Sequence, residues 1–157
     1  MSKLYVDEIH PKTSGKHVVM PEKPAFFASL AATQSFSSIT GGVDLTQYLT
    51  SIDFNIGNHY SAANGFVAPI DGVYHFSCGF YYYNASDGEL RVFKNGAIYQ
   101  RLSNSLLGAN RNPFSAQASF TMQLVADDAI KMNFSSATNA SMYNGYRNTF
   151  FSGFLVG

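Results

Sequence analysis

The 157-residue sequence has one cysteine, no tryptophan and no long apolar run. With Cys78 alone, an internal disulfide is excluded. A reactive cysteine needs an exposed, electropositive setting, but the residues around Cys78 include Phe76 and Phe80. We therefore interpret Cys78 as a reduced thiol in a core strand. No run approaches the ~20 apolar residues of a membrane span, and residues 1–15 lack the apolar stretch of an export signal, so we expect neither a membrane partner nor secretion.

Charged residues are also scarce, at 13% of the chain, and ten basic residues balance ten acidic ones. Proteins that bind nucleic acid usually carry a basic excess, because lysine and arginine displace the counterions condensed on phosphates. Neither an excess nor a cluster of Lys and Arg occurs here. The sequence therefore predicts no nucleic-acid partner and no anionic membrane surface as a partner.

The sequence lacks motifs of catalysis and metal binding. Its four histidines do not fall into metal-ligand spacings, and it has no HExxH, nucleophile elbow or glycine-rich phosphate loop. We therefore predict no enzyme activity, no cofactor and no metal. Four acidic residues in turn-like segments are candidates for a calcium site, but ordinary turn acids are the preferred interpretation because calcium needs about six converging oxygens. These acids are Asp87, Glu89, Asp127 and Asp128.

What the sequence does contain is alternation of apolar and polar residues, with little helical periodicity. Alternate positions of a strand face opposite sides of a sheet. In 73–83 one side would carry apolar residues only, and 116–124 and 130–134 alternate in the same way. Turn-forming segments such as "VADDA" (125–129) separate the strands. The pattern predicts a sandwich or barrel of antiparallel strands. We expect the C-terminal apolar strand to be paired in the middle of a sheet, because at an edge it would be exposed and prone to association.

From Pro24 onward the sequence resembles the globular head of complement component C1q and its tumour necrosis factor-like relatives. The most specific motifs are "NGFVAPIDGVYHF" (64–76) and "FSGFL" (151–155). The other matching segments, in the same order as in that family, lie within 24–30, 52–77, 90–97, 120–134 and 150–157. The resemblance implies an all-β, antiparallel, ten-stranded jelly-roll sandwich over residues 24–157 that assembles as a homotrimer; an unrelated sandwich is the alternative.

The same resemblance implies roles for the residues of the first motif. Gly65, Pro69 and Gly72 would turn the chain from one sheet to the next. Tyr74 and Phe76 would then enter the core of the sandwich.

We expect residues 1–23, which contain two short apolar segments, to form a separate and extended N-terminal arm. The stretch "SKLYVDEIHPKTSGKHVVMP" resembles the leader that opens many virion structural proteins of tailed phages. A docking arm could pair with strand edges of neighbouring proteins. The residues expected to make these contacts are Leu4, Tyr5, Val6, Ile9, Val18 and Val19.

The sequence holds more aromatic residues, ten Tyr and fourteen Phe, than one small core needs. The alternation of side chains along each strand places several of them on the outer side of the sandwich, where a subunit contact would bury them. On the last strand, either the set containing Phe151 or the set containing Phe150 must leave the core. The residues predicted for the trimer interface are Phe27, Tyr81, Tyr83 and Phe151. Stacking of exposed tyrosines on sugar rings is the rival interpretation.

Together these features predict a non-enzymatic phage virion structural protein. The preferred role is a homotrimeric capsid decoration, or cement, protein that stabilises the shell through its arm and has the major capsid protein as partner. The alternative is a tail-fibre or spike tip that binds a host-surface glycan. We expect the protein on the capsid exterior, after assembly in the host cytoplasm, whereas a secreted signalling ligand is disfavoured by the absence of an export signal.

Overall fold

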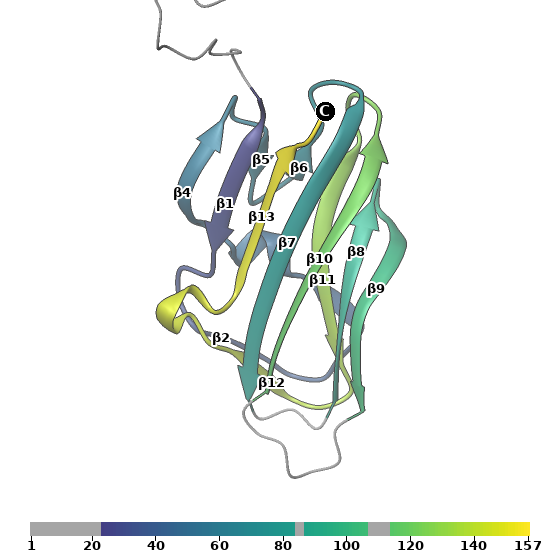
Figure 1. The fold of residues 1–157 in the computed structure, drawn as a ribbon. Helices are drawn as coiled ribbons and strands as arrows, with labels where there is room; N and C mark the ends of the chain where they lie inside the picture. The colour runs from purple at the N-terminus through teal and green to yellow at the C-terminus, as the bar shows by residue number, and fades with distance from the viewer. Residues whose placement is uncertain (1–22, 84–86, 107–113) are drawn as a thin grey trace, which may run out of the picture.

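The computed structural model describes residues 23–83, 87–106 and 114–157, which form two β-sheets packed face to face (Figure 1). The described chain contains thirteen strands and two short 3₁₀-helices. In chain order these are β1 (Ala25–Ser29), β2 (Gln34–Phe36), β3 (Ile39–Asp44), η1 (Leu45–Tyr48), β4 (Ser51–Ile56), β5 (Tyr60–Ser61), β6 (Gly65–Val67), β7 (Gly72–Tyr83), β8 (Asp87–Lys94), β9 (Ala97–Leu106), β10 (Phe114–Leu124), β11 (Ala129–Ser136), β12 (Ala140–Met142), η2 (Gly145–Arg147) and β13 (Phe150–Leu155).

Both sheets are antiparallel, as the alternation in the sequence predicted. The first, called sheet A, has the order β2-β12-β7-β13-β1-β4, with β10 paired along the other side of β7. The second, sheet B, has the order β5-β6-β11-β8-β9, with β3 also paired to β11. The jelly-roll prediction is confirmed. The additional short strands β2, β3 and β12 have three to six residues each, too few and too polar to give a strand signal in the sequence.

The "NGFVAPIDGVYHF" segment carries the chain from sheet B to sheet A, as expected. Gly65 opens β6 with a φ of +75°, and a Cβ there would lie 2.2 Å from the Ile130 carbonyl oxygen, so only glycine fits. Residues 68–71 make the crossing, and the Tyr74 hydroxyl donates back to the Ile70 carbonyl at 2.8 Å. This bond lets the tyrosine ring enter the core while its hydroxyl remains satisfied.

The core between the sheets is rich in aromatic rings. Phe26 stacks on Tyr60 at 4.7 Å and on Phe66 at 5.2 Å between ring centroids. The inward side of β7 is fully buried, with exposed fractions of at most 2%, which confirms the face predicted from its alternation. It carries Tyr74, Phe76, Cys78, Phe80 and Tyr82.

Phe151 was predicted for the trimer interface, and this prediction is wrong. Its side chain is 0% exposed and packs in the core against Phe26 and Phe76, at 5.0 and 5.6 Å. Strand β13 lies between β7 and β1, which confirms the central placement of the C-terminal strand. Its register pairs Gly153 with Phe76, and a Cβ on Gly153 would lie 2.4 Å from that ring. The side of β13 that carries Phe151 and Gly153 therefore faces the core, and Phe150 faces outward.

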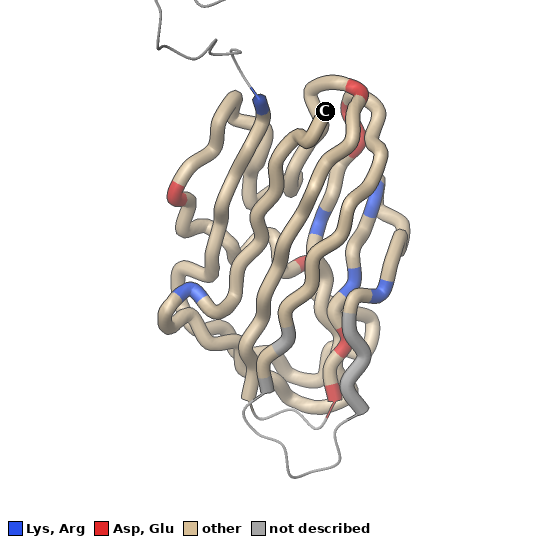
Figure 2. Tube along the Cα trace, viewed as in Figure 1, with Lys and Arg blue, Asp and Glu red and all other residues tan. Residues whose placement is uncertain are grey.

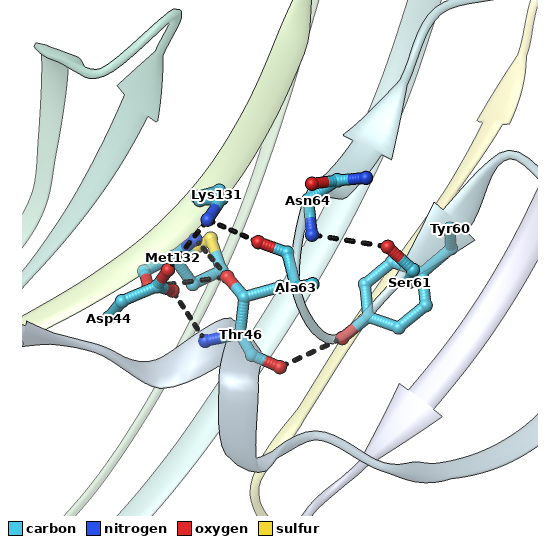
Figure 3. Close-up of polar contacts among 8 residues, drawn as sticks. All are labelled: Asp44, Thr46, Tyr60, Ser61, Ala63, Asn64, Lys131 and Met132. Carbon is cyan, nitrogen blue, oxygen red and sulfur yellow. Dashed lines mark hydrogen bonds and ion pairs between the residues drawn. The ribbon is translucent and has the colours of Figure 1, made fainter.

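A buried threonine fills a gap in the hydrogen bonding of β11 (Figure 3). On one side of β11, β6 pairs up to Ile130 and β3 starts at Asn133. Between them the Thr46 hydroxyl accepts from the Met132 N–H at 2.9 Å and donates to the Met132 carbonyl at 3.4 Å. The Tyr60 hydroxyl donates to the Thr46 carbonyl at 3.3 Å, so η1 is tied to two strands of sheet B, β11 and β5.

A second buried polar cluster joins two turns at one end of sheet B. The Asp128 carboxylate accepts from Asn95 Nδ2 at 2.7 Å and from the Val125 N–H at 2.9 Å, and it pairs with Lys94 Nζ at 2.7 Å. Burial by itself would raise the pKa of Asp128, but the bonds from Lys94, Val125 and Asn95 outweigh it and lower the pKa below its usual range. The charged carboxylate therefore stabilises the "VADDA" turn.

This cluster makes the stability sensitive to acid. A carboxyl whose folded pKa lies below its unfolded value near ~3.9 stabilises the fold above that value and stops doing so as the pH falls through the folded pKa. We expect Asp128→Asn to lower the free energy of unfolding by about 1–3 kcal/mol at pH 7 and by clearly less at pH 3, measured by urea unfolding. Asp127→Asn, an exposed change in the same turn, is the control. An equal loss at both pH values would contradict the prediction.

Candidate functional site

The outer side of sheet A, which faces away from the core, carries large apolar side chains on the neighbouring strands β4, β1 and β13. Three of them are between 47% and 49% exposed, although each is a large hydrophobic residue. Strand β4 is the edge of the sheet, and Phe54 pairs in register with Phe27. We call this surface the apolar face; it consists of Phe27, Phe54, Ile56, Phe150 and Phe154.

Aromatic rings form a continuous row across the apolar face. Phe27 stacks on Phe150 with the ring centroids 5.4 Å apart, and its centroid lies 6.5 Å from that of Phe54. The Arg147 guanidinium lies over Phe27, 5.9 Å from the ring centroid, and pairs with Asp53 on β4. Contiguous apolar patches of this kind, bordered by polar groups, mark interaction surfaces.

The other half of the outer side, on β7 and β10, carries mainly polar side chains, together with Val73, Tyr81 and Tyr83. His75 Nδ1 lies 3.2 Å from Thr121 Oγ1, and the His75 ring lies 5.4 Å from that of Phe154, at the border with the apolar face. Beside them, small polar side chains including Ser77 and Ser119 line a shallow pocket of about 340 Å³. Sheet A therefore offers one half suited to apolar burial and one half suited to hydrogen bonding.

Of the residues predicted for an interface, Phe27 lies within the apolar face. Tyr81 and Tyr83 are half-buried on the same outer side of β7, and Tyr81 contacts Tyr143 at 5.6 Å between ring centroids. The arm residues Leu4, Tyr5, Val6, Ile9, Val18 and Val19 lie outside the described residues.

Most of the apolar face was missed from the sequence. Its β4 residues, Phe54 and Ile56, belong to the alternating segment "IDFNI" (52–56), which is a strand signal. The register shift between Ile52 and Phe54 separates Ile52 from them. That signal identifies the apolar face only when β4 is known to be an edge strand and its inner side is known to pack against the rest of the domain.

The four acidic residues considered for calcium do not converge. Asp87 and Glu89 lie at one end of the β8–β11 ladder, where Glu89 pairs with Ser135, whereas Asp127 and Asp128 precede Ala129 at the other end. Within the described ranges, no group of three or more His, Cys, Asp or Glu is placed to hold a metal ion.

The single thiol is inaccessible and unreactive in this fold. Cys78 is buried, and its Sγ points to the Ala118 carbonyl at 3.6 Å. Burial raises the pKa of Cys78 to about 12, so the group is a neutral thiol near pH 7. In the part of the chain that the structure describes, no helix has the length and apolar character needed to cross a membrane.

Two antiparallel sheets in this order, closed around an aromatic core, define a C1q/TNF-like jelly roll. The sequence model of the C1q domain matches residues 25–156, so the chain belongs to the C1q domain family. Domains of this kind are generally binding or structural modules without catalytic activity, and C1q/TNF-like domains commonly form homotrimers. Among curated proteins, none matches the chain in sequence.

Solved structures share the fold at low sequence identity. The Eiger TNF of S. frugiperda superposes with a TM-score of 0.63 at 12% identity, covering 88% of this chain and 94% of its own. The globular domain of the zebrafish complement 1qA protein gives 0.61 at 14% identity, covering 87% and 98%. Murine APRIL gives 0.62 at 11% identity, covering 86% and 100%.

Proposed function

We propose that this protein is a non-enzymatic structural module that assembles as a homotrimer through the apolar face. The apolar face is the observation that carries the proposal. Two large residues of one edge strand, Phe54 and Ile56, are each about half exposed and lie beside the stacked rings of Phe27 and Phe150. Burial against a neighbouring subunit removes this surface from water, and a stable contact of this kind covers about 800 Å² per partner.

The placement of the chain ends supports an attachment role. The Leu155 N–H donates to the Pro24 carbonyl at 3.0 Å, and the Val73 N–H donates to the Gly157 carbonyl at 2.8 Å. The start of β1 and the C-terminus thus lie at the same end of the sandwich, at the top of Figure 1. In a trimer with its axis along the strands, three arms leave from one end and the opposite end points away from the attachment.

The assembly to which the arm attaches is proposed to be the capsid of a tailed phage. This part rests on the leader-like sequence of residues 1–23 and on the apolar residues in it. The trimer would act as a decoration protein on the capsid exterior, assembled in the host cytoplasm, with the arm adding strands to the edges of shell proteins.

A second candidate is a tail-fibre or spike tip that binds a host-surface glycan. It is favoured by exposed tyrosine rings outside the apolar face, because tyrosine stacks on sugars: Tyr146 is 95% exposed and Tyr99 is 55% exposed. The number of copies per particle separates the roles, since hundreds indicate the shell and a handful indicate the tail.

Light scattering and shell binding test the proposal. The full chain is expected to have three times its chain mass of 17.2 kDa at micromolar concentration. A variant with Leu4→Asp, Val6→Asp and Ile9→Asp should remain trimeric but lose binding to purified shells, because charged residues replace the apolar contacts of the arm. A monomeric full chain contradicts the trimer, and normal shell binding by the trimeric variant contradicts the docking arm.

A further inference from the structure

The short segment η2, just before β13, presents one tyrosine side chain almost entirely to solvent. Tyr146 is 95% exposed. Its φ of +54° and the φ of +57° at Arg147 place two successive residues in the left-handed region, which is unfavourable for residues with a Cβ. Backbone strain of this kind persists only where the surrounding structure holds it, and it concentrates at functional sites. A large ring held outward at such a position indicates a binding role.

Hydrogen bonds on both sides of the tyrosine hold the segment in place. On the N-terminal side, Asn144 Nδ2 donates to the Ala31 carbonyl at 3.1 Å, and Asn144 Oδ1 accepts from Thr33 Oγ1 at 3.0 Å. On the C-terminal side, Thr149 Oγ1 donates to the Tyr143 carbonyl at 3.0 Å. The ring is therefore carried on a fixed backbone before any partner arrives, which lowers the entropy cost of binding.

The position of this ring links it to the apolar face. The next residue, Arg147, lies over Phe27 and pairs with Asp53, so the segment is tied to the β4 side of sheet A. A neighbouring subunit that covers Phe27 would therefore also reach Tyr146. The protruding ring thus extends the apolar face at one of its borders.

The shallow pocket of about 340 Å³ between β7 and β10 lies at another border of the apolar face. We call it the β7–β10 pocket. One wall is the ring of Phe150, which lies so close to Gly79 that a Cβ there would be 2.5 Å from it. The rest of the lining includes Ser77, Gln117 and Ser119. Strands β7, β10 and β13 contain no Lys, Arg, Asp or Glu, and their described residues are tan in Figure 2.

This lining matches the phenol group of a tyrosine. The ring of a tyrosine can pack against the ring of Phe150, since offset or edge-to-face contacts between aromatic rings are favourable. Its hydroxyl can donate to or accept from the hydroxyl groups of Ser77 and Ser119 or the amide of Gln117. Because no charged residue belongs to these strands, the pocket suits a neutral group better than an ion.

We propose that Tyr146 of one subunit inserts into the β7–β10 pocket of the next subunit around the threefold axis. This inference rests on the proposed homotrimer and names a contact that sets how its subunits meet. A contact in a ring of three identical subunits is heterologous, which means that it joins two different surfaces of the same chain. The exposed ring and the pocket are such a pair, and both border the apolar face.

Dilution of the full chain, followed by analytical ultracentrifugation, tests the contact. Tyr146→Ala is expected to raise the concentration at which half of the trimer is dissociated by about tenfold or more, because tyrosines that anchor an interface carry much of its binding energy. Ser119→Phe, a change at an exposed position that fills the pocket, should have a similar effect. Tyr99→Ala is the matched control, because Tyr99 is 55% exposed on sheet B, and it should leave this concentration unchanged.

Chemical crosslinking tests the proximity of the two sites directly. In a variant with both Tyr146→Cys and Ser119→Cys, a short bismaleimide should join the chains into covalent trimers on a denaturing gel. Each single variant should stay uncrosslinked, because it lacks one of the two facing thiols. The native Cys78 does not interfere, since it is buried. Circular dichroism verifies that every variant is folded.

The outcomes separate this inference from the proposed function. A monomeric full chain contradicts the trimer and the insertion together. If the full chain is trimeric, the insertion alone is overturned when Tyr146→Ala and Ser119→Phe both dissociate like the unchanged protein, or when the double cysteine variant is not crosslinked. An effect of Tyr99→Ala as large as that of Tyr146→Ala also overturns it.

Discussion

Phe54→Asp is expected to convert the proposed trimer into a folded monomer. Phe54 is 47% exposed on the edge strand β4, with its ring 6.5 Å from that of Phe27 in the middle of the apolar face. In an isolated subunit the new carboxylate would remain in water, so the sandwich should keep its stability. In the trimer it would be buried without a partner, at a cost of several kcal/mol per contact. Since about 1.4 kcal/mol is a factor of ten, the subunits should dissociate at micromolar concentration.

Light scattering measures the assembly, and circular dichroism with thermal unfolding verifies that the monomer is folded. Ile70→Asp is the matched control, because Ile70 is 51% exposed in the turn between β6 and β7, outside the apolar face. It should remain trimeric. A Phe54→Asp variant that is still trimeric would show that the subunits meet through another surface, while loss of the fold in that variant would show that Phe54 stabilises the single subunit.

The core-facing side of most core strands could be predicted from the sequence, because apolar residues occupy every second position and polar or small residues occupy the positions between them. In β7 this alternation gave the correct buried set. In β13 the core-facing side could not be predicted, because "FFSGFL" has aromatic residues at both alternating sets of positions. The choice depends on Gly153: its position opposite Phe76 leaves no room for a side chain, and this is known only from the register between β13 and β7.

The surfaces proposed here for binding depend still more on long-range pairing. The alternation in β4 is visible in the sequence, but its exposure follows from the position of β4 at the edge of sheet A. The β7–β10 pocket combines Ser77, Ser119 and Phe150 from three separate strands. Gly79 is recognisable as a glycine in the sequence, yet its place beside Phe150 comes from the register between β7 and β13, and no local pattern encodes it.

Thr46→Val is expected to cause the largest loss of stability among the single changes considered. The two side chains have nearly the same shape, so packing changes little, but the hydroxyl is lost at a position that is 0% exposed. The Met132 N–H and carbonyl would then be left in the interior without the partner at 2.9 and 3.4 Å that they have now. An unsatisfied buried backbone group costs about 1–3 kcal/mol, which gives a loss on the order of 3 kcal/mol.

Thr46→Ser is the control, because it removes a methyl group and keeps the hydroxyl that bridges the gap between β6 and β3 along β11. It should cost about 1 kcal/mol, and the midpoint of thermal unfolding should fall by roughly 2–4 °C for each kcal/mol lost. The comparison is made at one protein concentration, since assembly makes the midpoint concentration-dependent. If serine proves as damaging as valine, packing of the methyl group and not the hydroxyl holds η1 on sheet B.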